Sequence, residues 1–411
     1  MGGALLQLVS YGKQNEYLIS NPSISYFKYV HKRHTNFSME SIPNNFNESL
    51  NFDRKVTCTI GKHGDLVNKM LLEIKLPAME NADLSGEPVG WTVGLGHSII
   101  RKAEILIGGV IVDTIDGEWL DIYTEFNLDA SKKKGYYEMI KYSKLADNYS
   151  YNDAMNLYIP LQFWFCRNMG SSLPLIALQY HDVTVNIHIR PLSECVFAIN
   201  SNDKPKQVNI LEAKLYCNYI FLDTKERKHF AQSSHEYLIT QHQKNINNVI
   251  NYSNSSLKVD LEFNLPVKTL YWTLQNREAQ KMNLWNDFSL NPQRIKRIKR
   301  IEPLKSVEMK LNGHDRFSER SAEHFRLIEP YNFSNVIPDK FMYTYNFGIN
   351  PDSYQPSGAI NFSRIDSSSM FFNFNMNSSV SGTNDIDIKI YAINYNILII
   401  SNGMGGVKYN D

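Results

Sequence analysis

Short runs in which apolar and polar residues alternate recur along most of the 411-residue chain. Successive side chains of a β-strand point to opposite faces, so each run predicts a strand with one buried face. Helical periodicity is nearly absent, which together with these runs predicts an all-β protein. The alternating residues are Val56, Cys58 and Ile60; Met70, Leu72, Ile74 and Leu76; Leu157, Ile159, Leu161, Phe163 and Phe165; Val183, Val185, Ile187 and Ile189; Leu257, Val259, Leu261, Phe263 and Leu265; Met370, Phe372, Phe374 and Met376; and Ile386, Ile388 and Ile390.

Proline positions refine these strand predictions. Pro77 and Pro266 end two of the runs, whereas Pro160 lies inside a third. Proline cannot donate a backbone hydrogen bond to a neighbouring strand, so Pro160 predicts an edge strand or a bulge.

A different pattern occupies residues 217–242, near the middle of the chain. Asp223, followed by Glu226 three positions later, is typical of a helix start. We expect a helix of about two turns that ends near Ser233 and Ser234, before a new strand begins. The apolar residues that would share one face of the preceding strand are Leu215, Cys217, Tyr219 and Phe221.

Three short matches, in the same order, relate the two halves of the chain. Their offsets of 189, 204 and 175 residues differ as loop insertions would make them differ, so we predict a duplicated domain. The matches are Leu72–Pro77 with Leu261–Pro266, Glu104–Gly109 with Glu308–Gly313, and Lys214–Tyr216 with Lys389–Tyr391.

The length of each half favours one sandwich architecture over another. A half of about 190 residues with about eight strands suits a jelly roll, whereas an immunoglobulin-like sandwich needs about 100 residues. We expect a tandem double jelly roll, two eight-stranded antiparallel β-sandwiches with short connecting helices. The expected divisions are an N-terminal arm at 1–24, a first domain at 25–222, and a second domain with a C-terminal tail at 223–411.

Composition and charge exclude several classes of protein. The 43 basic and 42 acidic residues leave a formal net charge of +1, whereas a protein that coats nucleic acid carries a basic excess. No apolar run approaches the ~20 residues of a membrane helix, and the N-terminus lacks the features of a secretory signal. Leu6 stands where myristoylation of Gly2 requires Ser or Thr. The cysteines are widely spaced and include no Cys-x-x-Cys pair, which favours reduced thiols over disulfides or a zinc ribbon: Cys58, Cys166, Cys195 and Cys217.

Three patterns invite a site interpretation, and a structural role is favoured for each. The Gly94-Leu95-Gly96 segment before Ile99 lacks the third glycine and the strand–helix frame of a nucleotide loop, so a connecting loop is expected. Tyr180-His181-Asp182 has no accompanying nucleophile elbow, so strand-end packing is expected. We expect no catalytic, cofactor-binding or metal-binding residue. The histidines without metal-ligand spacing, for which hydrogen-bonded structural roles are expected, are His31, His34, His235 and His242.

Besides residues 217–242, a series of distinctive motifs covers nearly the whole chain. They are Asn21–Lys28, His31–Phe37, Ile107–Gly109, Gly117–Leu120, Ile159–Phe165, Leu173–His181, Asn312–Phe317, Gln355–Gly358, Asn361–Asp366, Tyr391–Leu398 and Gly403–Gly406. These motifs closely resemble those of the major capsid proteins of the nucleocytoplasmic large DNA viruses, and they occur in the order in which that family has them. One difference lies in the closing strand, where Ile399 follows Leu398 and the family often has arginine.

The resemblance implies a structural protein of the virion, without enzymatic activity or cofactor. It implies a homotrimer that forms a pseudo-hexagonal capsomer, tiles an icosahedral shell and is assembled in the host cytoplasm. Neighbouring capsomers, minor capsid proteins and the inner viral membrane are the expected partners, with no direct contact to nucleic acid. The alternatives are a transient scaffold or minor double jelly-roll paralogue, and a tandem jelly-roll glycan-processing enzyme, which would need paired acidic residues in a cleft.

Two further features keep alternatives open. The basic run Arg294–Arg300 is expected to be a solvated loop, with contact to an acidic minor capsid protein or to lipid headgroups as the functional alternative. An Asn- and Ser-rich chain produces glycosylation sequons by chance, and we do not expect these to meet the secretory machinery, whereas virally encoded glycosylation stays open. The sequons begin at Asn36, Asn47, Asn148, Asn251, Asn254, Asn332, Asn361 and Asn377.

Overall fold

The computed structural model describes residues 2–79, 89–142, 153–198, 206–251, 256–292, 300–375 and 385–409. The chain divides into two units, Met1–Asn36 and Phe37–Asp411. The first unit contains two short helices, α1 (Gly3–Val9) and α2 (Lys13–Ile19), whose residues are all exposed. All described strands lie in the second unit.

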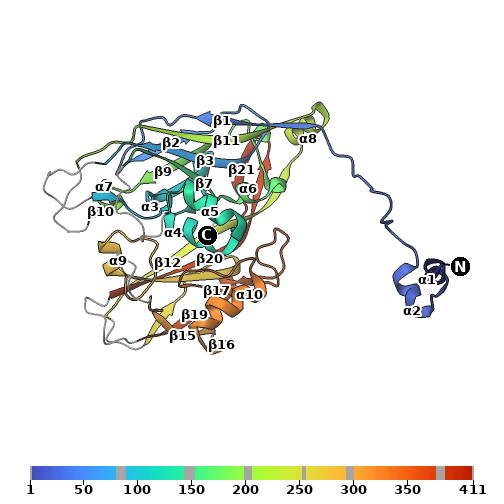
Figure 1. Ribbon diagram of the computed structural model, residues 1–411. Coiled ribbons are helices and arrows are strands. Elements are labelled where there is room, and N and C mark those ends of the chain that lie inside the picture. Colours follow the sequence, from blue (N-terminus) through green and yellow to red (C-terminus); the bar gives the residue numbers. More distant parts are fainter. Residues whose placement is uncertain are drawn as a thin grey trace. The chain divides into compact units, whose positions relative to one another are not determined.

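The strands of the first half form a sandwich of two antiparallel sheets (Figure 1). The first sheet has the order β1 (Phe37–Asn44), β11 (Glu212–Leu222), β3 (Leu66–Leu76) and β7 (Met155–Leu161), with β8 (Leu173–Pro174) beside β3. The second sheet has the order β2 (Lys55–Thr59), β9 (Val183–Ile189), β5 (Ile100–Ile107) and β6 (Val110–Ile115). A separate pair consists of β4 (Val89–Trp91) and β10 (Val196–Ala198).

The strands of the second half form a second sandwich. Its first sheet has the order β12 (His235–Asn251), β20 (Asp385–Ser401), β14 (Pro266–Asn276) and β17 (Met342–Asn346), with β18 (Ile360–Asn361) beside β14 and β21 (Met404–Val407) beside β20. Its other sheet has the order β13 (Ser256–Asp260), β19 (Ser368–Phe374), β15 (Leu304–Leu311) and β16 (His314–Ser321).

Both sandwiches share one topology. When the main strands of each are numbered from one to eight in chain order, one sheet has the order 1-8-3-6 and the other has 2-7-4-5. This order is the jelly roll, in which the strand pairs wrap across the two sheets. The predicted tandem double jelly roll, with eight main strands in each sandwich, is therefore confirmed.

Short helical segments connect the strands. Two of them, α4 (Gly117–Asn127) and α5 (Ala130–Met139), lie between β6 and β7, and in Figure 1 they lie between the two sandwiches. The others are α3 (Leu95–Ser98), α6 (Trp164–Arg167), η1 (Met169–Ser171), η2 (Leu175–Ala177), α7 (Leu192–Cys195), α8 (Thr224–Gln232), α9 (Arg277–Lys281), the π-helical turn η3 (His324–Ile328), α10 (Glu329–Phe333) and η4 (Phe362–Arg364). Within the described residues, no helix combines the length and apolar character that crossing a membrane requires.

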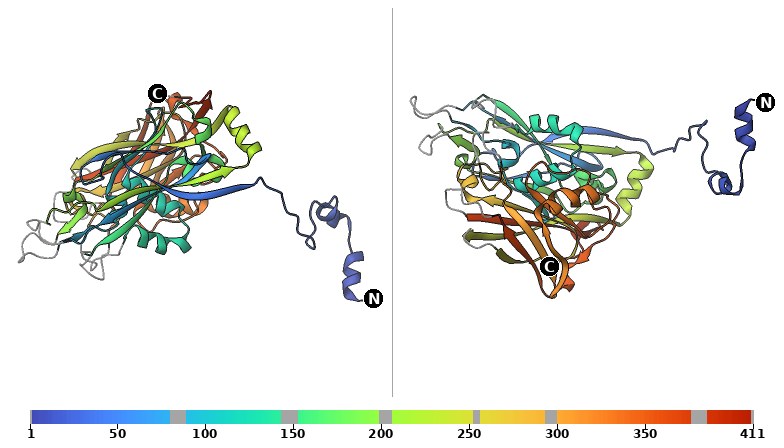
Figure 2. Two further views of the ribbon diagram at one scale, coloured as in Figure 1. Left: turned by 90° about the horizontal axis from the view of Figure 1, so that it is seen from above. Right: turned by 60° about the horizontal axis from the view of Figure 1, so that its bottom comes forward.

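The predicted helix at the middle of the chain is α8, which links β11 to β12 at one end of the sandwiches (Figure 2). The Asp223 carboxylate accepts a hydrogen bond from the backbone N–H of Glu226 at 2.9 Å, as the capping pattern predicted. The helix ends at Gln232, and β12 begins at His235.

Two apolar clusters fill the second unit. One fills the interior of the second sandwich around Trp272 and Phe372. The other fills the first sandwich and continues to Tyr271, Tyr391 and Ile393, on the outer face of the sheet β12-β20-β14-β17. Because this cluster includes residues from both halves, the sandwiches share a buried apolar interface.

Most predicted strands are confirmed, and two are shorter than predicted. Pro160 lies in β7, which is the edge strand predicted from it. The run that begins at Leu257 was predicted to continue to Leu265, but β13 ends at Asp260. Leu261 and Phe263 are buried outside any strand, and Leu265 adopts a left-handed conformation with φ 62°. The alternating apolar residues there are buried side chains of a segment that forms no hydrogen-bonded β-strand.

The other long run is also shorter than predicted. The strand predicted from Leu157 to Phe165 ends at Leu161, because the chain turns into α6 at Trp164. Phe163 and Phe165 are fully buried, so here too the apolar pattern extends beyond the strand. Met376 lies outside the described residues.

Two of the three internal matches occupy equivalent positions. Gly108-Gly109 and Asn312-Gly313 both connect the fourth and fifth main strands, and Lys214 and Lys389 both lie in the eighth. The remaining match, Leu72–Pro77 with Leu261–Pro266, is wrong. Leu76 lies at the end of β3, the third main strand of its sandwich, whereas Leu265 lies before the start of the equivalent strand β14. Duplication of the fold holds, although that alignment does not.

Candidate functional site

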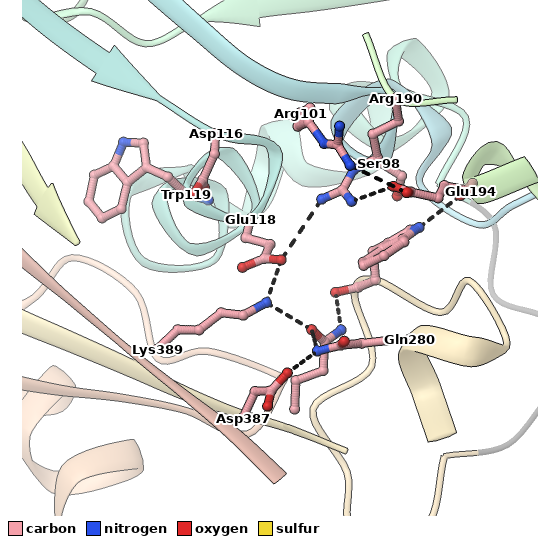
Figure 3. Close-up of polar contacts among 12 residues, drawn as sticks. Ser98, Arg101, Asp116, Glu118, Trp119, Arg190, Glu194, Gln280, Asp387 and Lys389 are labelled. Carbon is pink, nitrogen blue, oxygen red and sulfur yellow. Dashed lines mark hydrogen bonds and ion pairs between the residues drawn. The ribbon is translucent and has the colours of Figure 1, made fainter. Parts of the chain in front are cut away.

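Helix α4 of the first sandwich lies on the outer face of the sheet β12-β20-β14-β17 of the second (Figure 3). We call this buried interface the seam. The helix begins where the Asp116 carboxylate accepts a hydrogen bond from the backbone N–H of Trp119 at 2.7 Å. A Cβ at Gly117 would lie 2.0 Å from the carbonyl oxygen of His97, so only glycine allows the helix to approach α3 this closely.

Glu118 is the centre of one group of charges in the seam. Its Oε1 lies 2.6 Å from Nζ of Lys389 on β20, and its Oε2 accepts a hydrogen bond from the Tyr391 hydroxyl at 3.2 Å. Lys244 on β12 lies 2.5 Å from Asp116 and 3.5 Å from Glu118. Burial by itself would raise the pKa of Glu118, but the surrounding cations, Lys389 foremost, lower it to about 2.

Lys340 is the centre of a second group. Its Nζ lies 2.7 and 2.6 Å from the two oxygens of Asp121 and 3.7 Å from Glu125. Lys133 bridges Glu125 and Asp339, at 2.8 Å from each. Burial would lower the pKa of Lys340, but the carboxylates, Asp121 foremost, raise it above its ordinary value. Glu118 and Lys340 therefore both stay charged inside the protein.

Aromatic rings pack between the two groups of charges. The ring of Trp119 lies 4.3 Å from that of His242 and 5.8 Å from those of Tyr271 and Tyr391, measured between centroids. Phe126 packs on Tyr271 at 4.9 Å. The apolar contact excludes water from the ion pairs, which strengthens their attraction.

His242 joins the two sandwiches as a neutral hydrogen-bonding group. Nη2 of Arg167 lies 2.8 Å from Nε2 of His242, and Nδ1 lies 3.0 Å from Asp113. Because arginine can only donate, Nε2 accepts and Nδ1–H donates to the carboxylate. Burial lowers the pKa of this imidazole, although Asp113 opposes the shift.

Further contacts extend the seam at its edge. Arg190 pairs with Glu194 at 3.0 Å, and its guanidinium lies 3.9 Å from the ring of Trp285. The Gln280 side chain donates a hydrogen bond to Asp387 at 2.8 Å (Figure 3). The seam thus consists of paired charges, hydrogen bonds and packed aromatic rings, an arrangement suited to fixing two domains together.

Among the residues that invited a site interpretation, only His242 lies in the seam, whereas the family motifs Gly117–Leu120 and Tyr391–Leu398 contribute Glu118 and Tyr391 to it. His235 lies 2.8 Å from the carbonyl of Phe230, and the His181 ring lies 3.1 Å from the carbonyl of Gly405. His31 and His34 lie in the first unit. Within the described ranges, no group of three or more His, Cys, Asp and Glu residues is placed to hold a metal. The absence of catalytic residues stays a prediction.

The remaining patterns are only partly described. Gly94 has a left-handed conformation and begins the short helix α3, where a connecting loop was predicted. Of the basic run, 294–299 lie outside the described residues, and Arg300 lies 3.8 Å from Asp287. The sequons at Asn148, Asn254 and Asn377 also lie outside, and nothing is described of the Asn251 side chain. The exposed sequon asparagines are Asn36, Asn47, Asn332 and Asn361.

Sequence reasoning did not identify the charges of the seam. Three acidic residues, Glu118, Asp121 and Glu125, follow a spacing of three and four positions, which places them on one face of a helix. That spacing, interleaved with Trp119 and Ile122, was a usable signal of α4. Lys389 and Lys340, the main partners of Glu118 and Asp121, lie 271 and 219 residues away from them and carry no such signal.

Family models and known proteins resemble the chain over nearly its whole length. The model described as major capsid protein N-terminus matches residues 25–223, and the model described as large eukaryotic DNA virus major capsid protein matches residues 226–406. The major capsid proteins of Phaeocystis pouchetii virus and Pyramimonas orientalis virus are 33% and 35% identical, over the whole of both chains.

Solved structures give the same result. A chain in the quasi-atomic model of the PBCV-1 virus capsid has a TM-score of 0.78 and 28% identity, with 94% of this chain and 100% of that chain covered. The Faustovirus major capsid protein has a TM-score of 0.77 at 13% identity, which supports the fold alone.

Proposed function

The chain belongs to the major capsid protein family of large eukaryotic DNA viruses, and from this premise we propose that it is the repeating structural unit of an icosahedral virion shell. In this proposal it forms homotrimeric, pseudo-hexagonal capsomers that tile the shell, after assembly in the host cytoplasm. Its role is structural, with no enzymatic activity.

The observation that carries the proposal is the pair of sandwiches with identical strand order, joined by a buried seam. Three copies of such a chain present six similar sides, which suits hexagonal packing around a threefold axis. A seam of buried ion pairs and packed aromatic rings supports the fixed angle between sandwiches that such tiling needs.

The proposed partners are other copies of the chain, neighbouring capsomers, minor capsid proteins and the inner viral membrane. The net charge of +1 speaks against direct contact with the genome. We also propose the divisions 1–24, 25–222 and 223–411 as arm, first domain and second domain. The bounds of β11 and α8 support the division at 222.

A transient scaffold or minor capsid paralogue has the same fold, so abundance separates it from the major protein. Quantitative mass spectrometry of purified virions should find this chain as the main shell component. Averaged electron micrographs of the purified protein should show threefold particles with a hexagonal outline. Monomeric particles, or a trace amount in virions, would contradict the proposal.

A further inference from the structure

The seam pairs two surfaces of different kinds. The first is the segment after the fifth main strand, which in the first sandwich is α4. The second is the outer face of the 1-8-3-6 sheet, which in the second sandwich is β12-β20-β14-β17. Because the fold is duplicated, each sandwich carries both surfaces, but the contact among the described residues uses only one of each.

Strand register matches the two sheets residue by residue. In the first sandwich Tyr216 of β11 pairs with Leu71 of β3, and in the second Tyr391 of β20 pairs with Tyr271 of β14. The matched positions are therefore Lys214 with Lys389, Leu215 with Ile390, Tyr216 with Tyr391, and Leu71 with Tyr271.

The outer faces of the two matched sheets differ in how exposed their side chains are. Under α4, the Lys389 side chain is 9% exposed, and Tyr391 and Tyr271 are buried. On the first sandwich, the Lys214 side chain is 36% exposed, and Tyr216 and Leu71 are half-buried. Lys214 and Lys75 both contact the carboxylate of Glu212, at 2.5 and 2.6 Å, and Glu73 lies opposite Lys214 in the strand register. An ammonium group has three donors, so Lys214 can also bind a further carboxylate.

The hairpins of the fourth and fifth main strands locate the counterpart of α4. Ala103 lies four residues before Ile107, the last residue of the fourth strand in the first sandwich, and it pairs with Ile115. Val307 lies four residues before Leu311, the last residue of the equivalent strand in the second sandwich, and it pairs with Arg320. Counting on from Ile115 and Arg320 matches Glu118 with Glu323, Trp119 with His324, and Leu120 with Phe325. Leu120 and Phe325 are both fully buried, each in the cluster of its own sandwich, which supports the match.

This second segment lacks the cover that α4 has. Glu323 is exposed, and within the described part of the chain it has no ion-pair partner. Apolar side chains that follow are exposed as well: Leu327 is 37%, Ile328 is 50% and Tyr331 is 76% exposed.

We propose that the segment Glu323–Tyr331 of one subunit covers the outer face of β1-β11-β3-β7 of the next, with Glu323 on Lys214 as Glu118 lies on Lys389. This inference rests on the proposed trimer and names the surfaces that close it. Three such contacts alternate with three seams, which gives a ring of six sandwiches. The occupant is a second copy of the chain, because the internal repeat supplies the matching geometry and charge.

A zero-length carbodiimide crosslink tests the contact on the unmodified protein. Trimers reassembled from ¹⁵N-labelled and unlabelled chains are treated with the reagent, which joins a carboxylate to an amine in contact. We expect a Glu323–Lys214 crosslink with mixed labels. The intrachain pair Glu212–Lys75 is the control and should give unmixed labels only. Trimers that lack the mixed crosslink would overturn this inference and leave the trimer standing, whereas a protein that stays monomeric would overturn both.

A charge exchange gives an independent readout. Glu323→Lys and Lys214→Glu should each raise the concentration at which half the trimer dissociates by about tenfold or more, and the double variant should recover most of the loss. Glu262→Lys, the same change at an exposed site on the second sandwich, should have little effect. Equal effects of Glu262→Lys and Glu323→Lys, or no recovery in the double variant, would contradict the pairing.

Discussion

Glu118 shows how a carboxylate stays ionised inside a protein interface. It is buried, yet Lys389, Lys244 and Arg190 surround it closely enough to lower its pKa to about 2. Such a pair contributes little beyond an apolar contact of the same shape, but loss of one partner leaves a buried charge without compensation. The seam is therefore sensitive to single substitutions.

Replacement of Glu118 tests this sensitivity. Glu118→Gln should lower the free energy of unfolding by about 3 kcal/mol, because Lys389 then has no carboxylate partner. Denaturant unfolding followed by tryptophan fluorescence measures the change. Asp260→Asn, which breaks the exposed pair of Asp260 with Lys258, is the control and should change stability only slightly. Similar small effects of both substitutions would contradict the importance of the seam.

Acid should weaken the seam in a defined range. The pKa of Glu118 is lowered from 4.5 to about 2 in the folded protein, so the unfolded chain binds more protons between these values. The stability that Glu118 contributes is present above about pH 4.5 and is lost as the pH falls to about 2. Asp121, whose pKa is also lowered, acts in the same direction.

Unfolding midpoints measured between about pH 6 and pH 2 check this expectation. The wild-type protein should lose stability steeply over that range, and Glu118→Gln should lose it less steeply, because its side chain does not titrate. Parallel curves would show that Glu118 is not the responsible group.

At the scale of elements, Gly117 allows α4 to pack closely against α3. Gly117→Ala would put a Cβ at 2.0 Å from the backbone oxygen of His97, so the helix must move away from α3. We expect this substitution to lower the thermal unfolding midpoint by several degrees. Gly135→Ala in α5 is the control, since open space surrounds it and alanine favours a helix interior by about 1 kcal/mol. A midpoint for Gly117→Ala at or above the wild-type value would contradict the packing described.

How far the elements were predictable depends on how local their signal is. Strands such as β3 and β9 have one buried face, so alternation revealed them, and the Asp223 cap revealed α8. The alternation up to Leu265 misled, because residues outside a strand are buried there. In α4, buried carboxylates interrupt the apolar stripe that marks a helix. Glu118 and Lys389 lie 271 residues apart, so their pairing follows only from the tertiary fold.

At the scale of the whole molecule, two sandwiches of one topology share a buried interface, and the chain has a net charge of +1. Contacts within a trimer should rest on shape and apolar burial, whereas contacts between trimers should be more polar. Ionic strength separates the two, because salt screens exposed ion pairs much more than buried ones.

Assembled shells exposed to rising salt test this difference. Shells should dissociate into intact trimers at high salt, because we expect the contacts between capsomers to be more exposed and polar than those within a trimer. Light scattering of the released material measures its mass. Release of monomers together with trimers at the same salt concentration would show that contacts within and between trimers do not differ in their sensitivity to salt.

The mass of the purified protein in solution tests the capsomer proposal most directly. Light scattering after size exclusion, near neutral pH and at moderate salt, should report 142.5 kDa, three times the chain mass of 47.5 kDa. A stable species of 47.5 kDa at micromolar concentration would contradict the proposal that this chain builds a trimeric capsomer.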